Sequence, residues 1–439
     1  MQTRFTAEQL SNPLIQEADS ILRKCVHCGF CTATCPTFVL TGDERDSPRG
    51  RIWMIRDMLE QDHEPPAQEV GFHLDRCLTC LSCMTTCPSG VDYMHLVDLG
   101  RHHIEEHGKR DFLDKSLRRL LGFILPRAGL FHKALFFARL ARPFKSLFTG
   151  RLRAMLELAP KKMRALDPVG SQDACYPAKD QAGKAKLRVA LMAGCAQRAI
   201  DPDINKATIA LLGRFGVEVV VKQKAYCCGA LSHHINDEKG AKDAMRSSVA
   251  AWAEELEKEG LDAVIVNTSG CGTTIKDYVN LLKDDPVYAA KAEAISALAK
   301  DITEFLHDHQ LLSSLPAQNI HVAYHAACSL QHGQKVLDAP KALLQKAGFT
   351  VAQARDSHLC CGSAGIYNVL QPELAGQLQA RKIDTLNEVA ADIVVAGNLG
   401  CINQLADVDA PIIHTVQLLD WAYGGKQPEL LATMSVNQA

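Results

Sequence analysis

Two copies of one cysteine spacing constrain the fold of this 439-residue chain more than any other feature. Each copy reads C-x2-C-x2-C-x3-C followed by proline, and the second begins 52 residues after the first. Such runs hold pairs of [4Fe–4S] clusters, because three thiolates of one run bind three irons and the other run supplies the fourth thiolate. We therefore predict two clusters. Their ligands are Cys25, Cys28, Cys31 and Cys87 for one cluster, and Cys77, Cys80, Cys83 and Cys35 for the other.

Zinc is the alternative explanation for closely spaced cysteines, since C-x2-C pairs also build zinc knuckles. A tetrahedral zinc ion needs only two such pairs. Zinc therefore leaves the third cysteine of each run, and the proline at Pro36 or Pro88, without a role. Clusters explain both features, and they predict that the chain carries electrons.

The composition is that of a soluble protein with more than one domain. A chain of 439 residues exceeds one ordinary core, and 47% hydrophobic and 22% charged residues are typical of globular proteins. The cysteines group as metal ligands and the N-terminus lacks the apolar core of a secretion signal, which indicates a reducing cytosol. No run approaches the roughly 18 apolar residues of a transmembrane helix. We expect a cytoplasmic protein without a nucleic-acid partner.

Positive charge is concentrated in one segment, although the net charge of the chain is only −2. Lys109 to Arg164 contains fifteen Lys or Arg and three acidic residues, and Pro126, Pro143 and Pro160 divide it into short amphipathic helices. Such helices can lie on an anionic membrane with their cations at the headgroups. They can equally connect two domains with the apolar stripe packed inward. The two interpretations are compatible.

From about Leu187 onward, short apolar runs alternate with helical patterns, as in parallel α/β units. The series occurs twice, and the cysteines repeat with it: Cys195 and Cys328 are 133 residues apart. We predict two related halves that face each other across a pseudo-twofold axis. The predicted fold is α/β with an α-helical segment, divided into a helical two-[4Fe–4S] ferredoxin module (1–108), a basic helical connector (109–186) and two halves (187–319 and 320–439).

A second set of cysteines occurs once in each of the two repeated halves. Each half contains the pattern C-x31-C-C-G and, later, a Gly-Cys pair after a strand. These residues are Cys195, Cys227, Cys228 and Cys271 in the first half, and Cys328, Cys360, Cys361 and Cys401 in the second. Strand ends would gather them at the carboxyl edge of a sheet, where ligand sites lie. We predict at least one further cluster or a redox-active thiol site here. The alternative is buried free cysteines, which behave as small hydrophobic residues.

Histidines accompany the second half: His325, His332, His358 and His414. Each can donate to a cluster sulfur, pass protons or act as a ligand, although a single histidine is more often packed or solvated. The chain shows no dinucleotide fingerprint, P-loop, Ser–His–Asp arrangement or HExxH motif. No site for an organic substrate or a flavin is therefore evident.

Taken together, these motifs resemble the iron–sulfur subunits of bacterial glycolate oxidase, more strictly a glycolate dehydrogenase. The resemblance spans almost the whole chain and includes ADSILRKCVHCGFCTATCPTFVLTGDE, PRGRI, TTCPSGV, TSGCG and DSHLCCGSAGIY. It implies a complex with an FAD-containing subunit that oxidises glycolate to glyoxylate, and with a second flavin-domain-type subunit. This chain would bind no FAD itself. It would pass electrons onward, to membrane quinone or another acceptor, from the cytoplasmic face of the inner membrane.

The wider family includes subunits of anaerobic glycerol-3-phosphate dehydrogenase and heterodisulfide-reductase-like proteins. In the latter, the last cysteine of each CCG module belongs to a C-x2-C pair, but Thr268 and Asn398 stand at the first position here. This departure puts disulfide reduction in doubt and leaves an ordinary cluster open. A disulfide-reducing enzyme, and a subunit that serves lactate or glycerol-3-phosphate oxidation, are the alternatives to the glycolate assignment.

Overall fold

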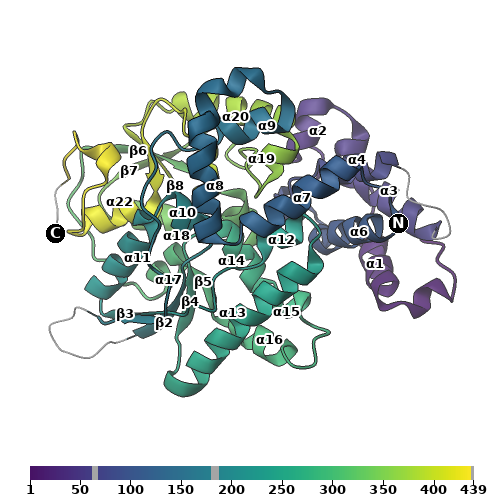
Figure 1. The fold of residues 1–439 in the computed structure, drawn as a ribbon, viewed down its shortest axis with the longest axis horizontal. Coiled ribbons are helices and arrows are strands. Elements are labelled where there is room, and N and C mark those ends of the chain that lie inside the picture. The colour runs from purple at the N-terminus through teal and green to yellow at the C-terminus, as the bar shows by residue number, and fades with distance from the viewer. Residues whose placement is uncertain (62–67, 179–186, 437–439) are drawn as a thin grey trace.

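The computed structural model describes residues 1–61, 68–178 and 187–436. Residues 62–67, in the predicted ferredoxin module, lie outside the described residues, as do 179–186 at the end of the predicted connector and 437–439 at the end of the second half. Figure 1 shows a helical end that carries the N-terminus and an α/β end that carries the sheets. The predicted α/β class with an α-helical segment is confirmed.

The N-terminal part consists of helices. Among its described residues these are η1 (Gln9–Ser11), α1 (Pro13–Lys24), α2 (Pro36–Thr41), η2 (Glu44–Asp46), α3 (Pro48–Glu60), α4 (Gln68–Asp75), α5 (Ser82–Thr86) and α6 (Tyr93–His107). α1 and α3 begin alike, with Asn12 or Ser47 capping a backbone N–H and proline at the first helical position. Their apolar faces meet α6 around Leu22, Ile55 and Leu96, and this core fixes the loops between the helices.

The connector forms α7 (Phe112–Ile124), α8 (Ala128–Ala141), η3 (Arg142–Leu147) and α9 (Gly150–Glu157). The breaks fall at the prolines, as expected: Pro126 separates α7 from α8, and Pro160 follows α9. α8 packs against α10 and α9 against α19, so the connector covers part of the α/β end. Within the described residues no single helix is long and apolar enough to cross a membrane. Only α7 together with Ala128–Leu147 meets that test, as a pair bent by 119°.

Two sheets carry the repeated halves. The first contains β1 (Ala174–Tyr176), β2 (Leu187–Met192), β3 (Val217–Val221), β4 (Ala263–Val266) and β5 (Ala299–Asp301), and the second contains β6 (His321–His325), β7 (Thr350–Gln353), β8 (Ile393–Ala396) and β9 (Ile412–His414). Their orders are β1-β3-β2-β4-β5 and β7-β6-β8-β9, so the second repeats the first without β1. All pairs are parallel except β1 with β3.

Helices of each half pack reciprocally against helices of the other half. α11 (Asp203–Arg214) of the first half packs on α22 (Thr415–Ala422) of the second, and α18 (Ala339–Lys346) of the second packs on α17 (Ile302–Asp308) of the first. A pseudo-twofold relation predicts this reciprocal packing, because the first long helix of each half contacts the last helix of the other. One hydrophobic core, which includes Leu211, Phe305, Leu344 and Leu419, therefore spans both halves.

The remaining elements include the long helices α13 and α20 and several short helices. They are α10 (Ala196–Ile200), α12 (Ala230–His234), α13 (Glu238–Glu259), α14 (Ser269–Lys276), α15 (Tyr278–Leu281), α16 (Ala289–Leu298), the π-helical turn η4 (Ser329–Gly333), α19 (Tyr367–Leu370), α20 (Pro372–Asn387), α21 (Leu399–Gln404) and η5 (Glu429–Leu431). In each half the first of the second-set cysteines follows a strand, the adjacent pair lies in a loop, and the last lies in a short helix, α14 or α21.

Candidate iron–sulfur centres

The two cysteine runs of the N-terminal part share one backbone conformation. His27 and Thr79, two residues after the first cysteine of each run, have φ of +57° and +50°, and Gly29 and Leu81, two residues further, have φ of +84° and +62°. Left-handed backbone is costly for residues other than glycine, so a fold retains it where it has a use. In the second run it directs the Thr79 N–H toward Cys77 Sγ, 3.4 Å away. Repeated turns of this kind form concave sites for negatively charged groups.

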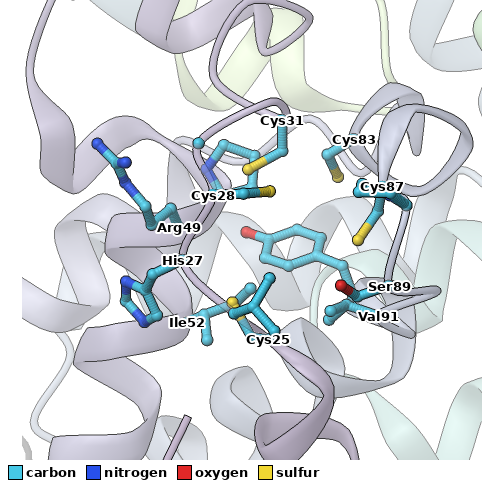
Figure 2. Close-up of a pocket in the computed structure, with 15 residues that line it drawn as sticks. Cys25, His27, Cys28, Cys31, Arg49, Ile52, Cys83, Cys87, Ser89 and Val91 are labelled. Carbon is cyan, nitrogen blue, oxygen red and sulfur yellow. The ribbon is translucent and has the colours of Figure 1, made fainter.

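The first cavity brings together the four cysteines predicted for the first cluster. Cys25 ends α1, Cys28 and Cys31 lie in the loop that follows, and Cys87 ends α5. Figure 2 shows these side chains around one space, with Ile52 and Val91 among the walls. Four soft thiol donors around one space, in a lining that also includes His27 and Arg49, fit an iron–sulfur cluster.

A second cavity is lined by the other four predicted ligands, namely Cys35, Cys77, Cys80 and Cys83. Cys83 lines both cavities, so the two sites are neighbours. Arg51 extends into the second site, with only 1% of its surface exposed, and its Nη1 lies 3.9 Å from Cys35 Sγ. The Tyr93 hydroxyl donates to Cys77 Sγ at 3.7 Å.

Charge in the second cavity favours one thiolate over the others. Burial opposes ionisation of Cys77, but the nearby cations Arg51 and Arg101 outweigh it and lower the pKa of this thiol. Burial, reinforced by neighbouring thiols, raises the pKa of Cys80 and Cys83 well above the ordinary value. These two thiols therefore become stable anions only when a metal balances their charge.

In the first CCG half the four predicted cysteines form one group. Cys195 follows β2, Cys227 and Cys228 precede α12, and Cys271 lies in α14. The Sγ atoms of Cys195 and Cys227 are 3.7 Å apart, and the thiol of Cys228 contacts those of Cys227 and Cys271. All four belong to one continuous set of thiols.

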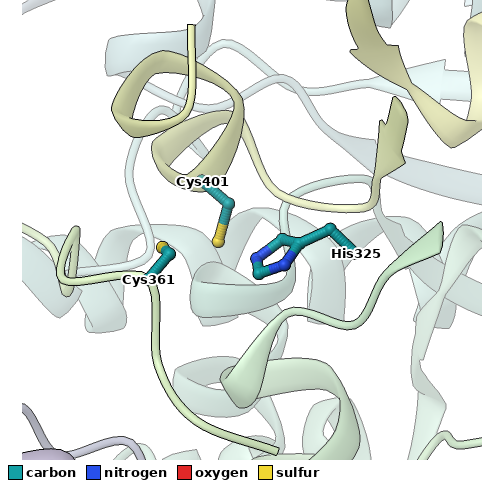
Figure 3. A group of neighbouring side chains, drawn as sticks. All are labelled: His325, Cys361 and Cys401. Atoms are coloured by element: carbon teal, nitrogen blue, oxygen red, sulfur yellow. The ribbon is translucent and has the colours of Figure 1, made fainter. Parts of the chain in front are cut away.

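The second half repeats the arrangement with Cys328, Cys360, Cys361 and Cys401. The Sγ atoms of Cys328 and Cys360 are 3.6 Å apart, and Cys361 contacts both Cys360 and Cys401. A histidine joins this group: His325, at the end of β6, has a ligand atom within 4.8 Å of the sulfurs of Cys361 and Cys401 (Figure 3). Burial lowers the pKa of His325 to about 3, so its ring is neutral.

The glycine after each cysteine pair is required by the packing. Gly229 and Gly362 have φ of +83° and +89°, and an added Cβ would lie 2.8 Å from Ala241 O and 2.7 Å from Ala375 O. The tight turn directs the Gly229 N–H to Cys227 Sγ at 3.4 Å. A backbone donor thus points at a sulfur of the first-half group, as the CCG pattern suggests.

The two residues that replace a cysteine of the C-x2-C pattern have structural roles. Thr268 and Asn398 each precede a short helix, α14 and α21. The Thr268 hydroxyl bonds the Gln197 side chain, whereas Asn398 Nδ2 donates to Cys401 Sγ at 3.6 Å. In the second half, therefore, a polar contact to a cysteine sulfur is found where the C-x2-C pattern would place a further thiolate.

The other predicted histidines have different surroundings. His332 Nδ1 lies 2.8 Å from the Thr85 hydroxyl, and its Nε2 lies 3.0 Å from the His358 carbonyl. His414 caps α22 through its Nδ1. Of the four, only His325 joins cysteines in a group that could hold a metal, among the described residues. The lone Cys175 is exposed on β1.

The second cavity adjoins the second CCG half, a contact that the sequence did not predict. Cys80 and Cys360 are buried in one apolar cluster, and Cys328 packs against it. The bond between Thr85 and His332 ties α5 to η4 beside this junction. Some 248 residues separate Cys80 from Cys328, and no local pattern could reveal the contact. Arg51 was also missed as a neighbour of the sulfurs, although PRGRI contains it.

Comparison with known families identifies both kinds of site. The 4Fe-4S dicluster domain family matches residues 24–91, and the cysteine-rich CCG domain family matches residues 189–276 and 322–406. Multiple [4Fe–4S] clusters are thus the cofactors of this chain, and the prediction of two in the ferredoxin module is confirmed. Zinc is not needed to explain the cysteine runs.

A solved structure supports the fold alone. The crystal structure of a hypothetical protein from Helicobacter pylori aligns with 97% of this chain and 74% of its own chain, with a TM-score of 0.53 and 11% identity.

Lactate utilization protein A of Geobacillus kaustophilus (strain HTA426) is 27% identical over 53% of this chain and 99% of that protein.

Two longer matches decide the family. The glycolate oxidase iron–sulfur subunit of Escherichia coli (strain K12) is 39% identical over 96% of this chain and 99% of that protein. The probable glycolate oxidase iron–sulfur subunit of Bacillus subtilis (strain 168) is 30% identical over 92% of this chain and 93% of that protein. With both kinds of cysteine site in place along the whole alignment, this chain belongs to the family of glycolate oxidase iron–sulfur subunits.

Proposed function

We propose that this chain is the electron-transfer subunit of a glycolate:acceptor oxidoreductase and that it does not itself bind glycolate. An FAD-containing partner oxidises glycolate to glyoxylate, and a second flavin-domain-type subunit completes the complex. The observation that carries the proposal is an unbroken series of thiol sites. It runs from the first cavity through Cys83 to the second, and through Cys80 to Cys328 and Cys360.

The two ends of this series differ in exposure. At the first cavity Cys28 is exposed, and Val26 and Phe30 beside it are 66% and 62% exposed. At the other end Cys360 and Cys361 are buried. An apolar rim around an accessible ligand suits a protein partner, because exposed apolar patches mark contact sites. We place the FAD subunit at this rim.

The chain's own residues prepare the sites for charge. Bound clusters accept and release single electrons, at potentials set by hydrogen bonds to sulfur and by burial. Arg51 offsets negative charge at Cys35 and Cys77, and the Tyr93 hydroxyl donates to Cys77. Apolar residues, including Leu78 and Leu81, also line the second cavity. Thr268 and Asn398 in place of cysteine argue against the disulfide-reducing alternative.

Anaerobic iron and sulfide analysis with EPR of the reduced full chain tests the proposal. About eight irons correspond to the dicluster module alone, and about twelve or sixteen show that the CCG halves are loaded too. We expect more than eight, together with reduction of the clusters by the FAD partner and glycolate. Clusters that stay oxidised while that partner turns over glycolate with an artificial acceptor would contradict the proposal. Replacing glycolate with lactate or glycerol-3-phosphate in the same assay distinguishes the alternative substrates.

We further propose that the connector binds the cytoplasmic face of the inner membrane, where quinone would be the acceptor. Eleven of the 21 large hydrophobic residues that are exposed in the described chain lie between Phe112 and Leu152. The exposed cations Arg119, Lys133 and Arg139 alternate with them along α7 and α8. This combination suits an anionic lipid surface, since apolar side chains insert while cations meet the headgroups.

Co-sedimentation of the full chain with anionic and neutral liposomes tests the membrane proposal. We expect binding to anionic vesicles that salt weakens, and loss of most binding in the double variant Phe136→Ser and Phe137→Ser. Val287→Ser, which removes a side chain of similar exposure outside the connector, is the matched control and leaves binding unchanged. Equal binding by both variants would show that the connector is not the membrane-binding segment.

A further inference from the structure

The two CCG halves differ at one position next to the sulfurs. Met192 ends β2 and His325 ends β6, three residues before Cys195 and Cys328 respectively. The strand registers match as well, since Met192 pairs with Val266 and His325 with Ala396, and each of these partners lies five residues before the last cysteine of its half. The same place in the fold thus holds a thioether in the first half and an imidazole in the second.

The His325 ring is buried with an unused polar atom. Only 3% of the residue is exposed, and Nε2 has no hydrogen-bond partner among the described residues. A buried nitrogen without a partner is energetically costly, so a fold retains one where something else satisfies it. The nitrogen faces a defined neighbour: Figure 3 shows the ring directed at Cys401 and Cys361, and the three ligand atoms lie within 4.8 Å of one another.

We propose that His325 is a ligand of an iron ion in the second CCG half, together with Cys361 and Cys401. The second half then holds a mixed imidazole–thiolate iron–sulfur centre, whereas the first half offers thiolates alone. The proposal rests on the loading of the CCG halves proposed above. It adds a residue outside the cysteine pattern to the ligand set, and it makes the two halves chemically different.

The chemistry of the donor set favours iron. One imidazole and two thiolates suit several borderline metals, including zinc and iron. However, Cys328 and Cys360 extend the same group through the contact between Cys360 and Cys361, which gives four thiols and one imidazole. A single tetrahedral zinc cannot use five donors, whereas a multi-iron cluster can.

An imidazole ligand also changes the redox potential of the centre, and therefore which cluster is reduced first. Replacing thiolate by neutral histidine raises the potential of an iron–sulfur centre, as Rieske centres show against plant-type ferredoxins. Lys382, which is 3% exposed and donates to the Asp356 carbonyl, adds positive charge near Cys360 and Cys361. The half that adjoins Cys80 is therefore the half equipped to accept electrons.

Pulsed EPR of the reduced full chain, produced with 15N-labelled histidine, tests the ligand directly. We expect a strongly coupled histidine nitrogen in the wild type and its loss in His325→Met, which installs the first-half residue. The redox midpoint of one EPR signal should fall in this variant while the others stay constant. His358→Gln removes a nearby histidine ring that does not join the metal-binding group, and it keeps the coupled nitrogen.

The outcomes separate this inference from the proposed function. A full iron content without any strongly coupled histidine nitrogen in the wild type overturns the ligand and leaves electron transfer standing. A coupled nitrogen that persists in His325→Met overturns it as well. Iron confined to the dicluster module, or zinc at the second half, overturns the mixed centre, while reduction of the dicluster by the flavin partner still supports the relay. The wild-type spectrum is decisive even if the variant folds poorly.

Discussion

The two CCG halves share a topology but meet the ferredoxin module through different chemistry. The first half contacts it through ion pairs: His95 lies between Asp92 and Asp277, and His233 meets Asp98. The second half contacts it mainly through sulfur and apolar groups, with Cys80 and Cys360 in one buried cluster, and through the hydrogen bond between Thr85 and His332. The two halves therefore share the arrangement of their cysteines but differ in the surface that each presents to the ferredoxin module.

If the chain transfers electrons as proposed, this contrast predicts that the first half anchors the ferredoxin module and that the second half receives its electrons. A charged contact holds two bodies in position but offers no redox group, whereas adjoining thiol sites shorten the path between clusters. Within the described residues, the apolar clusters around the first-half cysteines include no cysteine of the ferredoxin module. Variants in equivalent positions of the two halves can therefore break or sharpen the comparison.

The largest difference should appear in electron flow. Cys360→Ser removes a thiol beside Cys80, and we expect reduction of the terminal acceptor by the assembled complex to fall by more than the roughly 10–100-fold typical of losing an outer-shell partner. Cys227→Ser, the equivalent change in the first half, should leave most of the rate. Stopped-flow reduction with glycolate as donor measures both. Equal losses in the two variants would remove the functional distinction between the halves.

Stability should respond equally in the two halves, because their CCG turns are built alike. Gly229→Ala and Gly362→Ala each place a Cβ against a helix carbonyl at positive φ, and each should cost about 2–4 kcal/mol. Gly376→Ala in α20 is the control, since its added Cβ meets nothing within 4 Å. Thermal unfolding under anaerobic conditions measures the three variants. A marked difference between the two turns would show that the repeat is less exact than its backbone suggests.

The ionic contact of the first half should fail in alkali. Burial opposes protonation of His95, but hydrogen bonds to Asp277 and Asp92 outweigh it and raise its pKa to about 10. A raised histidine pKa stabilises the fold fully below the ordinary value of 6.5, and this stability is lost as the pH rises through about 10. Asp277→Asn should lower the melting temperature by several degrees near pH 6, at about 2–4 °C per kcal/mol.

The difference in melting temperature between wild type and Asp277→Asn should shrink as the pH approaches and passes 10. A constant difference from pH 6 to 10.5 would show that His95 carries no charge in this contact. Cluster content is measured alongside, because loss of iron would lower both melting temperatures together.

The smallest effect concerns a contact that has no symmetry mate. Ser269 in α14 and Ser329 in η4 join their hydroxyls at 2.7 Å across the halves, whereas the equivalent positions hold Leu399 and Ala196. Ser329→Ala should cost about 0.5–1.5 kcal/mol. A double-mutant cycle with Ser269→Ala measures the coupling by denaturant unfolding, and additive single effects would mean that the bond adds nothing.

Local patterns predicted much of the fold and few of its long-range contacts. The cysteine spacing predicted the number of clusters and the thiolate donors, and Pro126 and Pro160 predicted the breaks between the connector helices. Both signals act within a few residues of the chain. β1, β5 and β9 were missed, since three residues are too short to show a period. The junction of Cys80 with Cys360 depends on how two modules pack. The predicted domain boundaries and individual ligand sets stay predictions.

The edge strand β1 has a practical consequence for dissecting the molecule. Ala174–Tyr176 precedes the apolar pattern at Leu187, yet it pairs with β3, and Val169 before it is buried in the shared core. A recombinant fragment that begins at Leu187 would leave the β3 edge bare, and bare edges recruit other chains into aggregates. Expression of the α/β end by itself should therefore start before Asp167, which is itself completely buried.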